Sequence, residues 1–235
     1  MAPPSHPWNL SPSEAIALQK ELAARVICRG TPENVKTVAG VDVSFGGEMA
    51  RAAAVVLGFP DLEVTDHAVV TRPVTFPYIP GLFTFREGPV AVAAIEQLAK
   101  RPDLIIFDGQ GLAHPRRLGI ASHMGLLLDL PTIGCAKTRL CGTFDPPGPE
   151  KGSWSPLIHR GEVIGAAVRT RTNVRPVFVS PGHLLDLPSA IRFVLACCRK
   201  YRLPETTRQA DHVAGGGGIR DPSAGPRTPS GRPRP

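Results

Sequence analysis

The feature that most constrains the fold is a short run, residues 104–107, that contains only apolar side chains and ends at Asp108. Such a strand is typical of a sheet that is covered on both faces. A second apolar run, residues 132–136, ends at Lys137, and the segment between the two, residues 118–130, has a helical pattern. This alternation of strand and helix predicts a sheet with helices packed on it.

Three earlier runs, at residues 36–45, 49–59 and 62–70, have strand character and are joined by short, turn-rich links. Links this short join antiparallel neighbours. Two further strands are expected near residues 161–170 and 175–180, and further helices over residues 11–27, 89–100, 188–201 and 204–214. An antiparallel meander followed by strand–helix units predicts an α/β fold, with a mixed β-sheet flanked by helices.

The chain is long enough for one domain, which we expect to span residues 1–214. Residues 215–235 are rich in Gly, Pro, Ser and Arg, so they cannot bury a core and are expected to form a disordered tail. The net charge of +7 favours a polyanionic partner, although many unrelated enzymes carry such a charge.

The cysteines and the N-terminal residues bear on where the protein works. The five cysteines are odd in number and show neither a CxxC pair nor zinc-ligand spacing, which is typical of reduced thiols. The first residues lack the pattern of a signal peptide, and no apolar run approaches the ~20 residues of a membrane-spanning helix. We therefore expect a cytoplasmic protein that does not contact a membrane.

Four carboxylates from separate predicted elements are candidates for a shared site. They are Asp42 within the first strand, Glu87 just before the helix at Pro89, Asp108 at the end of its strand, and Asp211 in the last helix. A carboxylate in an apolar strand is costly to bury unless it is paired, and a cluster of carboxylates is stable mainly around a hard divalent cation. The alternative for each residue is a hydrogen bond to neighbouring backbone or an ion pair with an arginine.

Five motifs in order resemble the endonuclease V family. They are VAGVDVSF, FPYIPGLFTFRE, DGQGLAHPRRLGIASHMG, GCAKTRL and KYRLPETTRQAD, and the likeness covers roughly residues 6–214. The resemblance implies a ribonuclease H-like fold, and a monomer that uses Mg²⁺, or Mn²⁺ in its place. The implied reaction acts on deoxyinosine-containing DNA, hydrolysing the second phosphodiester bond 3′ to the deaminated purine to leave a 3′-hydroxyl and a 5′-phosphate.

The resemblance also assigns roles to individual residues. Asp42, Glu87 and Asp108 match the family's metal ligands, and Asp211, with His212 beside it, lies where the family has a fourth ligand. The stiff loop FPYIPG matches a wedge that separates strands, formed by Pro77, Tyr78, Ile79 and Pro80. The residues matching the lining of the base pocket are Gly81, Phe83, Gly109, Gly111, Ile120, Leu140 and Ser180. From the residues alone, the wedge is equally a surface turn with Tyr78 packed on the core, and the glycines are ordinary turn residues.

Basic residues surround these motifs. Lys137 and His114 are expected to assist catalysis electrostatically near the scissile phosphate, and the residues expected to contact phosphates are Arg86, Arg116, Arg117 and Arg139. The alternative for each is a solvated surface charge, or a structural histidine in the case of His114.

Two other functions remain open at this point. One is a ribonuclease of the same fold, specific for inosine in RNA or for nucleic-acid structure. The other is a catalytically silent nucleic-acid-binding protein, which the four intact carboxylates argue against.

Overall fold

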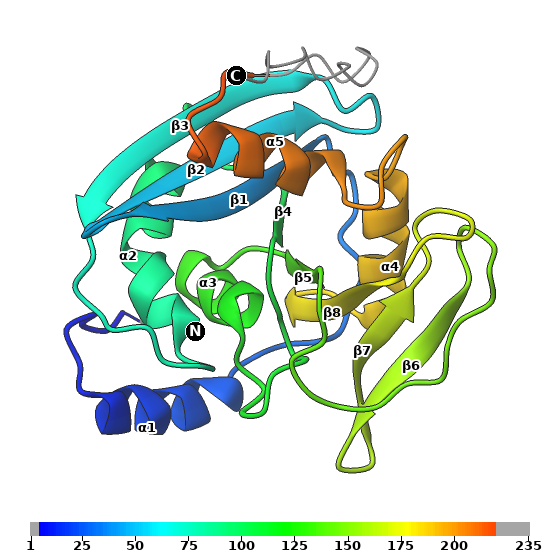
Figure 1. The fold of residues 1–235 in the computed structure, drawn as a ribbon, viewed down its shortest axis with the longest axis horizontal. Coiled ribbons are helices and arrows are strands. Elements are labelled where there is room, and N and C mark those ends of the chain that lie inside the picture. The colour runs from blue at the N-terminus through cyan, green and yellow to red at the C-terminus, as the bar shows by residue number, and fades with distance from the viewer. Residues whose placement is uncertain (1–4, 220–235) are drawn as a thin grey trace, which may run out of the picture.

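The computed structural model describes residues 5–219, so residues 1–4 and most of the predicted tail, residues 220–235, lie outside it. The described chain folds into one mixed sheet with helices on both faces (Figure 1). The strands are β1 (Thr37–Gly46), β2 (Met49–Gly58), β3 (Val64–Pro73), β4 (Leu104–Phe107), β5 (Thr132–Ala136), β6 (Trp154–His159), β7 (Glu162–Val168) and β8 (Val177–His183). The helices are α1 (Pro12–Ala23), α2 (Phe83–Glu96), α3 (Ile120–Leu128), α4 (Leu187–Ala196) and α5 (Glu205–Ala214).

The strand order is β3-β2-β1-β4-β5-β8-β7-β6. The predicted antiparallel meander of β1, β2 and β3 is confirmed, and β1, β4 and β5 pair in parallel. In the parallel pair of β1 and β4, Val41 lies opposite Phe107. Asp42 and Asp108 each follow one of these partners, so the two carboxylates emerge from neighbouring strands at the same level.

Alternation along β4 divides the core into two layers. Leu104 and Ile106 pack with the helices α4 and α5, whereas Ile105 and Phe107 pack with α2 and α3. All four side chains are buried, which confirms the expectation that this strand is covered on both faces. Gly40 and Asp42 are two residues apart on β1, so they are on the same face of the sheet. Because α5 packs directly over Gly40, Asp42 lies on the face that α5 covers.

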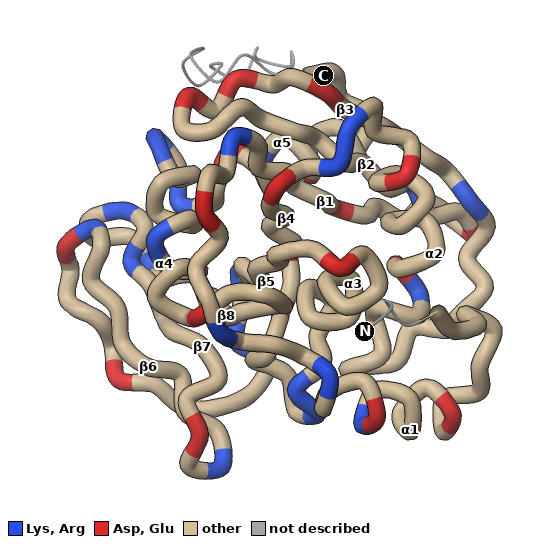
Figure 2. Tube along the Cα trace, turned by 180° about the vertical axis from the view of Figure 1, so that it is seen from behind, with Lys and Arg blue, Asp and Glu red and all other residues tan. Residues whose placement is uncertain are grey.

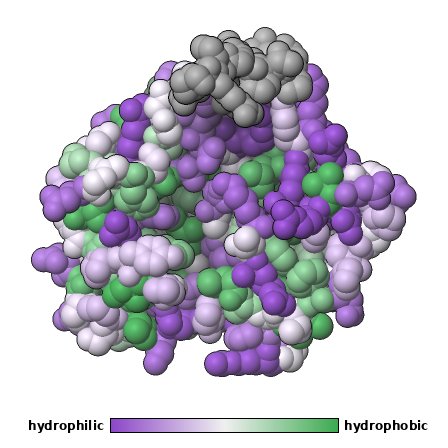
Figure 3. All heavy atoms as spheres, in the orientation of Figure 1, coloured by the Kyte–Doolittle hydropathy of each residue, from purple (hydrophilic) through white to green (hydrophobic). Residues whose placement is uncertain are grey.

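The surface is mixed in both charge and hydropathy. Acidic and basic residues are spread over the loops around the sheet (Figure 2). Hydrophobic and hydrophilic residues are interspersed on the face shown in Figure 3. Within residues 5–219, no helix is both long and apolar enough to cross a membrane.

The helix α2 differs from the sequence prediction. It begins at Phe83 rather than at Pro89, so Pro89 lies inside the helix and Glu87 is helical. Pro89 has no N–H to donate to the carbonyl of Phe85, which is why the proline suggested a helix start. The helix continues through it because the residues on both sides of Pro89, among them Phe85 and Val90, are buried.

One strand was missed. The segment of β6 contains Pro156, which weakens a strand signal, yet β6 pairs with β7 along its whole length. Proline is tolerated there because β6 is the outermost strand of the sheet, and its outer edge meets Thr143 at Ile158 rather than a further strand. A capping box begins α1, since Ser11 Oγ accepts from Glu14 N–H and Ser11 N–H donates to Glu14 Oε2 at 2.7 Å.

We predict that Gly40→Ala destabilises the protein by about 3 kcal/mol, because a Cβ at Gly40 would overlap the carbonyl oxygen of Thr206 in α5. Gly58→Ala is the matched control, since a Cβ there meets its nearest atom, Thr65 Cγ2, at 3.8 Å, an ordinary contact. Urea unfolding of both variants measures the difference. Equal midpoints for the two would contradict the close packing of α5 on β1.

Candidate active site

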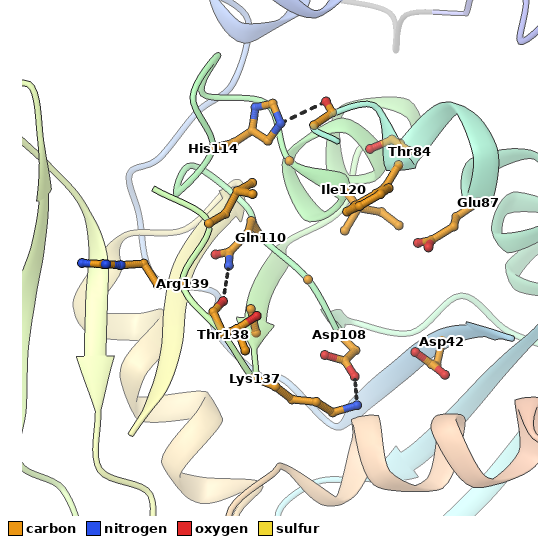
Figure 4. A pocket seen from close by; sticks show the side chains of 16 residues that line it. Asp42, Thr84, Glu87, Asp108, Gln110, His114, Ile120, Lys137, Thr138 and Arg139 are labelled. Carbon is orange, nitrogen blue, oxygen red and sulfur yellow. Dashed lines mark hydrogen bonds and ion pairs between the residues drawn. The ribbon is translucent and has the colours of Figure 1, made fainter. Parts of the chain in front are cut away.

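A pocket of about 360 Å³ opens at the ends of β1, β4 and β5, against the N-terminal halves of α2 and α3 (Figure 4). It is lined by Asp42, Gly81, Phe83, Thr84, Glu87, Asp108, Gly109, Gln110, His114, Gly119, Ile120, Ala136, Lys137, Thr138, Arg139 and Leu140. The lining combines carboxylates at one end with glycine and apolar residues at the other. Acidic groups and a cavity of this size therefore share one site.

Three of the four candidate carboxylates lie on this pocket. Asp42 comes from β1, Asp108 follows β4, and Glu87 points toward them from α2 (Figure 4). As they are placed, no three carboxylate, imidazole or thiol side chains of residues 5–219 are close enough to enclose a metal ion. The cation beside the carboxylates is the Lys137 ammonium, whose Nζ lies 2.6 Å from Asp108 Oδ2.

The fourth carboxylate reaches the same lysine from α5. Asp211 Oδ1 lies 3.7 Å from Lys137 Nζ, and its side chain is largely exposed. The neighbouring His212 ring instead lies against Gly217, where a Cβ would overlap it. Of the two candidates for this position, Asp211 is thus the one directed toward the other carboxylates.

Burial and mutual repulsion disfavour the charged forms of two site carboxylates. Burial, followed by the charges of Asp108 and Asp211, raises the pKa of Asp42 to about 7. Burial, followed by the charges of Asp42 and Asp108, raises the pKa of Glu87 to about 8. Burial alone would lower the pKa of Lys137, but its hydrogen bond with Asp108 and the surrounding negative charges raise it overall. A cation bound among these carboxylates would therefore favour their charged forms.

His114 is held as a neutral structural donor. The N–H of Arg116 donates to His114 Nδ1 at 3.2 Å, so His114 Nε2–H donates to the carbonyl of Gly81 at 3.1 Å. Burial, followed by the charge of Arg116, lowers the pKa of His114 to about 4. The imidazole thus ties the loop after β4 to the loop that precedes α2.

Two of the four candidate phosphate-binding arginines form hydrogen bonds or an ion pair with neighbouring segments of the chain. Arg116 donates to the Gly81 carbonyl at 2.8 Å and to Gln19 Oε1. Arg117 forms an ion pair of 2.7 Å with Glu162, near the turn between β6 and β7.

The other two arginines are stacked on aromatic rings. The Arg86 guanidinium lies 4.6 Å from the centroid of Phe45 and donates to the carbonyl of Phe76. Arg139 lies 5.7 Å from the Phe144 ring. Of the four arginines, Arg139 is the one that lines the pocket.

The loop of residues 77–80 leads directly into Gly81, which lines the pocket. Tyr78 is 67% exposed, so it is not packed into the core, and its ring centroid lies 5.0 Å from that of Phe83. Gly81 has a φ of +79°, a conformation that L-residues rarely adopt. An exposed aromatic side chain is therefore carried next to the pocket on a loop stiffened by two prolines.

The residues proposed to line a base pocket are only partly brought together. Gly81, Phe83, Gly109, Ile120 and Leu140 line the cavity. Gly111 and Ser180 were also expected there but are not among the lining residues.

These two residues support the pocket loop from behind. Gly111 N–H donates to Ser180 Oγ at 2.9 Å, and Ser180 is fully buried. Pairing of β5 with β8 brings Ser180 there, and a Cβ at Gly111 would overlap the Pro181 carbonyl oxygen.

Sequence reasoning missed several neutral residues of the lining, namely Thr84, Gln110, Gly119, Ala136 and Thr138. Gln110 Nε2 donates to the Thr138 carbonyl at 2.9 Å, which joins the loop after β4 to the loop after β5. Gln110 was missed because its side chain is neutral and so did not stand out among the candidate charged residues. Its position between two motif glycines was the signal that could have identified it.

The comparisons with known proteins match this architecture. The family model for endonuclease V matches residues 20–212. A curated endonuclease V from Roseiflexus sp. strain RS-1 is 55% identical over 213 residues, covering 91% of this chain and 96% of that protein.

Two solved structures are also similar. The endonuclease V from Streptomyces avermitilis has a TM-score of 0.85 and 46% identity, covering 89% of this chain and 93% of that one. The Ciona intestinalis endonuclease V, in complex with a 24mer DNA containing an inosine followed by a ribo-adenosine, has a TM-score of 0.72 and 28% identity, covering 87% of this chain and 96% of that one.

The helix-flanked mixed sheet is the α/β, ribonuclease H-like fold that the motifs implied. Because the family model and the curated relative both span most of the described fold, the chain belongs to the endonuclease V family of phosphodiester-cleaving nucleases.

Proposed function

We propose that this enzyme recognises a deaminated purine in a DNA strand, deoxyinosine above all, and hydrolyses the second phosphodiester bond on its 3′ side. The products are a 3′-hydroxyl and a 5′-phosphate. The observation that carries the proposal is that one pocket combines a glycine-rich, partly apolar part with the carboxylates. The inosine-containing DNA in the Ciona complex supports the choice of lesion. We further propose that the enzyme acts as a monomer, as the family resemblance implies.

The donor set fits a hard divalent cation. Asp42, Glu87 and Asp108 offer carboxylate oxygens on one pocket, and Asp211 stands beside them, so we propose that they hold Mg²⁺, with Mn²⁺ able to replace it. In the structure these carboxylates do not enclose an ion, so binding requires their side chains to move. When bound, the cation supplies a lowered pKa for the attacking water and neutralises charge on the phosphate.

Lys137 provides fixed positive charge at the reacting phosphate. It follows β5, and its ammonium already contacts Asp108. With a cation held by the carboxylates, the Lys137 ammonium would be available to stabilise the charge that develops on the phosphate oxygens. His114, which is neutral, acts instead by holding the Gly81 loop in place.

The other end of the pocket suits an extruded purine. Ile120 and Phe83 offer apolar surface, and Gly109 keeps the cavity open, because a Cβ there would lie 2.6 Å from Ile120 Cγ2. A backbone N–H that donates to O6 favours hypoxanthine, because the amino group of adenine at the same position would face the N–H donor to donor. Tyr78 occupies the space that the extruded base vacates.

The direct test is cleavage of a single-inosine oligonucleotide with and without Mg²⁺, with the cut mapped to one nucleotide. Matched DNA and RNA oligonucleotides separate the deoxyribonuclease from an inosine-directed ribonuclease. A cut at the second bond 3′ to inosine in DNA supports the proposal. Binding without cleavage in either metal would indicate a silent nucleic-acid-binding protein.

The raised carboxylate pKa values predict an unusual pH dependence of stability. Asp42 and Glu87 bind protons more tightly in the folded than in the unfolded state, so stability in EDTA falls as the pH rises between about 4 and 8. Asp42→Asn removes part of this loss of stability. The melting temperature of the variant minus that of wild type should therefore increase as the pH rises through that window. Adding Mg²⁺ at the upper end should stabilise wild type more than the variant.

A control variant should show the opposite trend. Hydrogen bonds from Lys36 and Thr37 outweigh the effect of burial and lower the pKa of Asp103, so its contribution to stability is lost as the pH falls. Asp103→Asn should thus cost stability at neutral pH and little at acidic pH. A melting-temperature difference for Asp42→Asn that does not change with pH would contradict the electrostatics described for the pocket.

We predict that Tyr78→Ala weakens the preference for inosine over an undamaged base by at least ~5-fold, since stacking is worth about 1–3 kcal/mol per base. Tyr78→Phe keeps the ring and should retain the preference. The measurement is kcat/KM on matched oligonucleotides, together with the Mg²⁺ concentration for half-maximal cleavage, which neither change should shift. An unaltered inosine preference in Tyr78→Ala would rule out the wedge.

A further inference from the structure

The segment just before α1 lies across the two helices that border the pocket. His6 Nε2 lies 2.8 Å from Nε2 of His123 in α3, so one ring donates and the other accepts. The Trp8 ring packs against Phe85 in α2 and against His123, with centroid distances of 6.2 and 5.8 Å. Rings from three separate parts of the chain thus form one cluster, which joins the N-terminal segment to α2 and α3.

Trp8 also touches the backbone beside a site carboxylate. A Cβ at Gly88 would overlap the Trp8 ring, so the indole rests directly on the Cα of Gly88. Gly88 follows Glu87 in the chain, and Glu87 points into the pocket on another side of the helix. The position of the indole is therefore coupled to the backbone that carries Glu87.

This turn of α2 has few bonds of its own. Its N-cap residue, Leu82, makes no side-chain capping bond. Pro89 has no N–H with which to bond the carbonyl of Phe85, so one bond of the helical ladder is lost around Glu87. Packing from outside the helix must supply the rigidity that capping and the full ladder provide elsewhere.

We propose that Trp8, held in place by the contact of His6 with His123, is a positioning residue that fixes Glu87 for cation binding. The proposal rests on the proposed metal site. His123 is fully buried in α3, so it gives the segment a rigid anchor. The residues that Trp8 meets on α2 and α3 are Phe85, His123 and Gly88, none of which lines the pocket, so it acts on Glu87 through the backbone at Gly88.

The sequence supplies a reporter for this coupling. The chain has two tryptophans, Trp8 and Trp154, and Trp154 is half exposed on the outermost strand β6. Trp154→Phe leaves Trp8 as the single indole. In that variant, titration with Mg²⁺ should change the emission of Trp8, and adding Glu87→Gln should abolish the change.

The functional readout is the Mg²⁺ concentration for half-maximal cleavage of the inosine oligonucleotide. Trp8→Ala should raise this concentration by at least ~10-fold, about 1.4 kcal/mol of cation affinity, and alter kcat at saturating Mg²⁺ much less. Trp8→Phe should restore most of the affinity. Trp154→Ala is the matched control and should leave the Mg²⁺ requirement unchanged.

Circular dichroism and thermal melting establish that each variant is folded. If Trp8→Ala does not fold, His6→Ala tests the same link by removing a smaller ring, and the emission titration of Trp154→Phe stands without it. An unshifted Mg²⁺ requirement in the folded variants, or Trp8 emission that ignores Mg²⁺ while cleavage is activated, overturns the positioning role. Failure of wild type to cut inosine-containing DNA with either metal is a separate result, which would overturn the proposed function.

Discussion

The parallel pairing of β1 with β4 is the contact on which the site depends. It sets Val41 beside Phe107, and so it brings Asp42 and Asp108 out of the buried centre of the sheet at the same level. Burial, together with the nearby charge of Asp108, disfavours the charged form of Asp42 and raises its pKa. Lys137, at the end of the next strand, offsets part of that cost through its contact with Asp108.

Helices on opposite faces of the sheet complete the site. On one face, α5 packs so closely on β1 that residue 40 must be glycine, and this packing carries Asp211 toward Lys137. On the other face, α2 brings Glu87 in from a turn weakened by Pro89 and supported by Trp8. The positions of Asp211 and Glu87 relative to the sheet therefore depend on how tightly α5 and α2 pack against it.

The errors of sequence interpretation have physical causes. Pro89 is a local signal for a helix start, but the helix continues on both sides of it because the neighbouring residues are buried against the rest of the protein. Pro156 weakened the signal of β6, and only its place at the sheet edge makes that strand possible. Ser180 was placed on the pocket by motif position, whereas its hydroxyl accepts a backbone hydrogen bond behind the loop.

The sequence by itself determined the mixed helix-flanked sheet, the family, and the identity of the acidic residues, because apolar periodicity and motif order are local properties of the chain. The tertiary structure decided which groups meet. The pairing of Lys137 with Asp108, the tether from His114 to Gly81, and the contact of Trp8 with Gly88 all join segments far apart in sequence. Such contacts depend on strand register and helix packing, which are set by the whole fold and leave no pattern in any one segment.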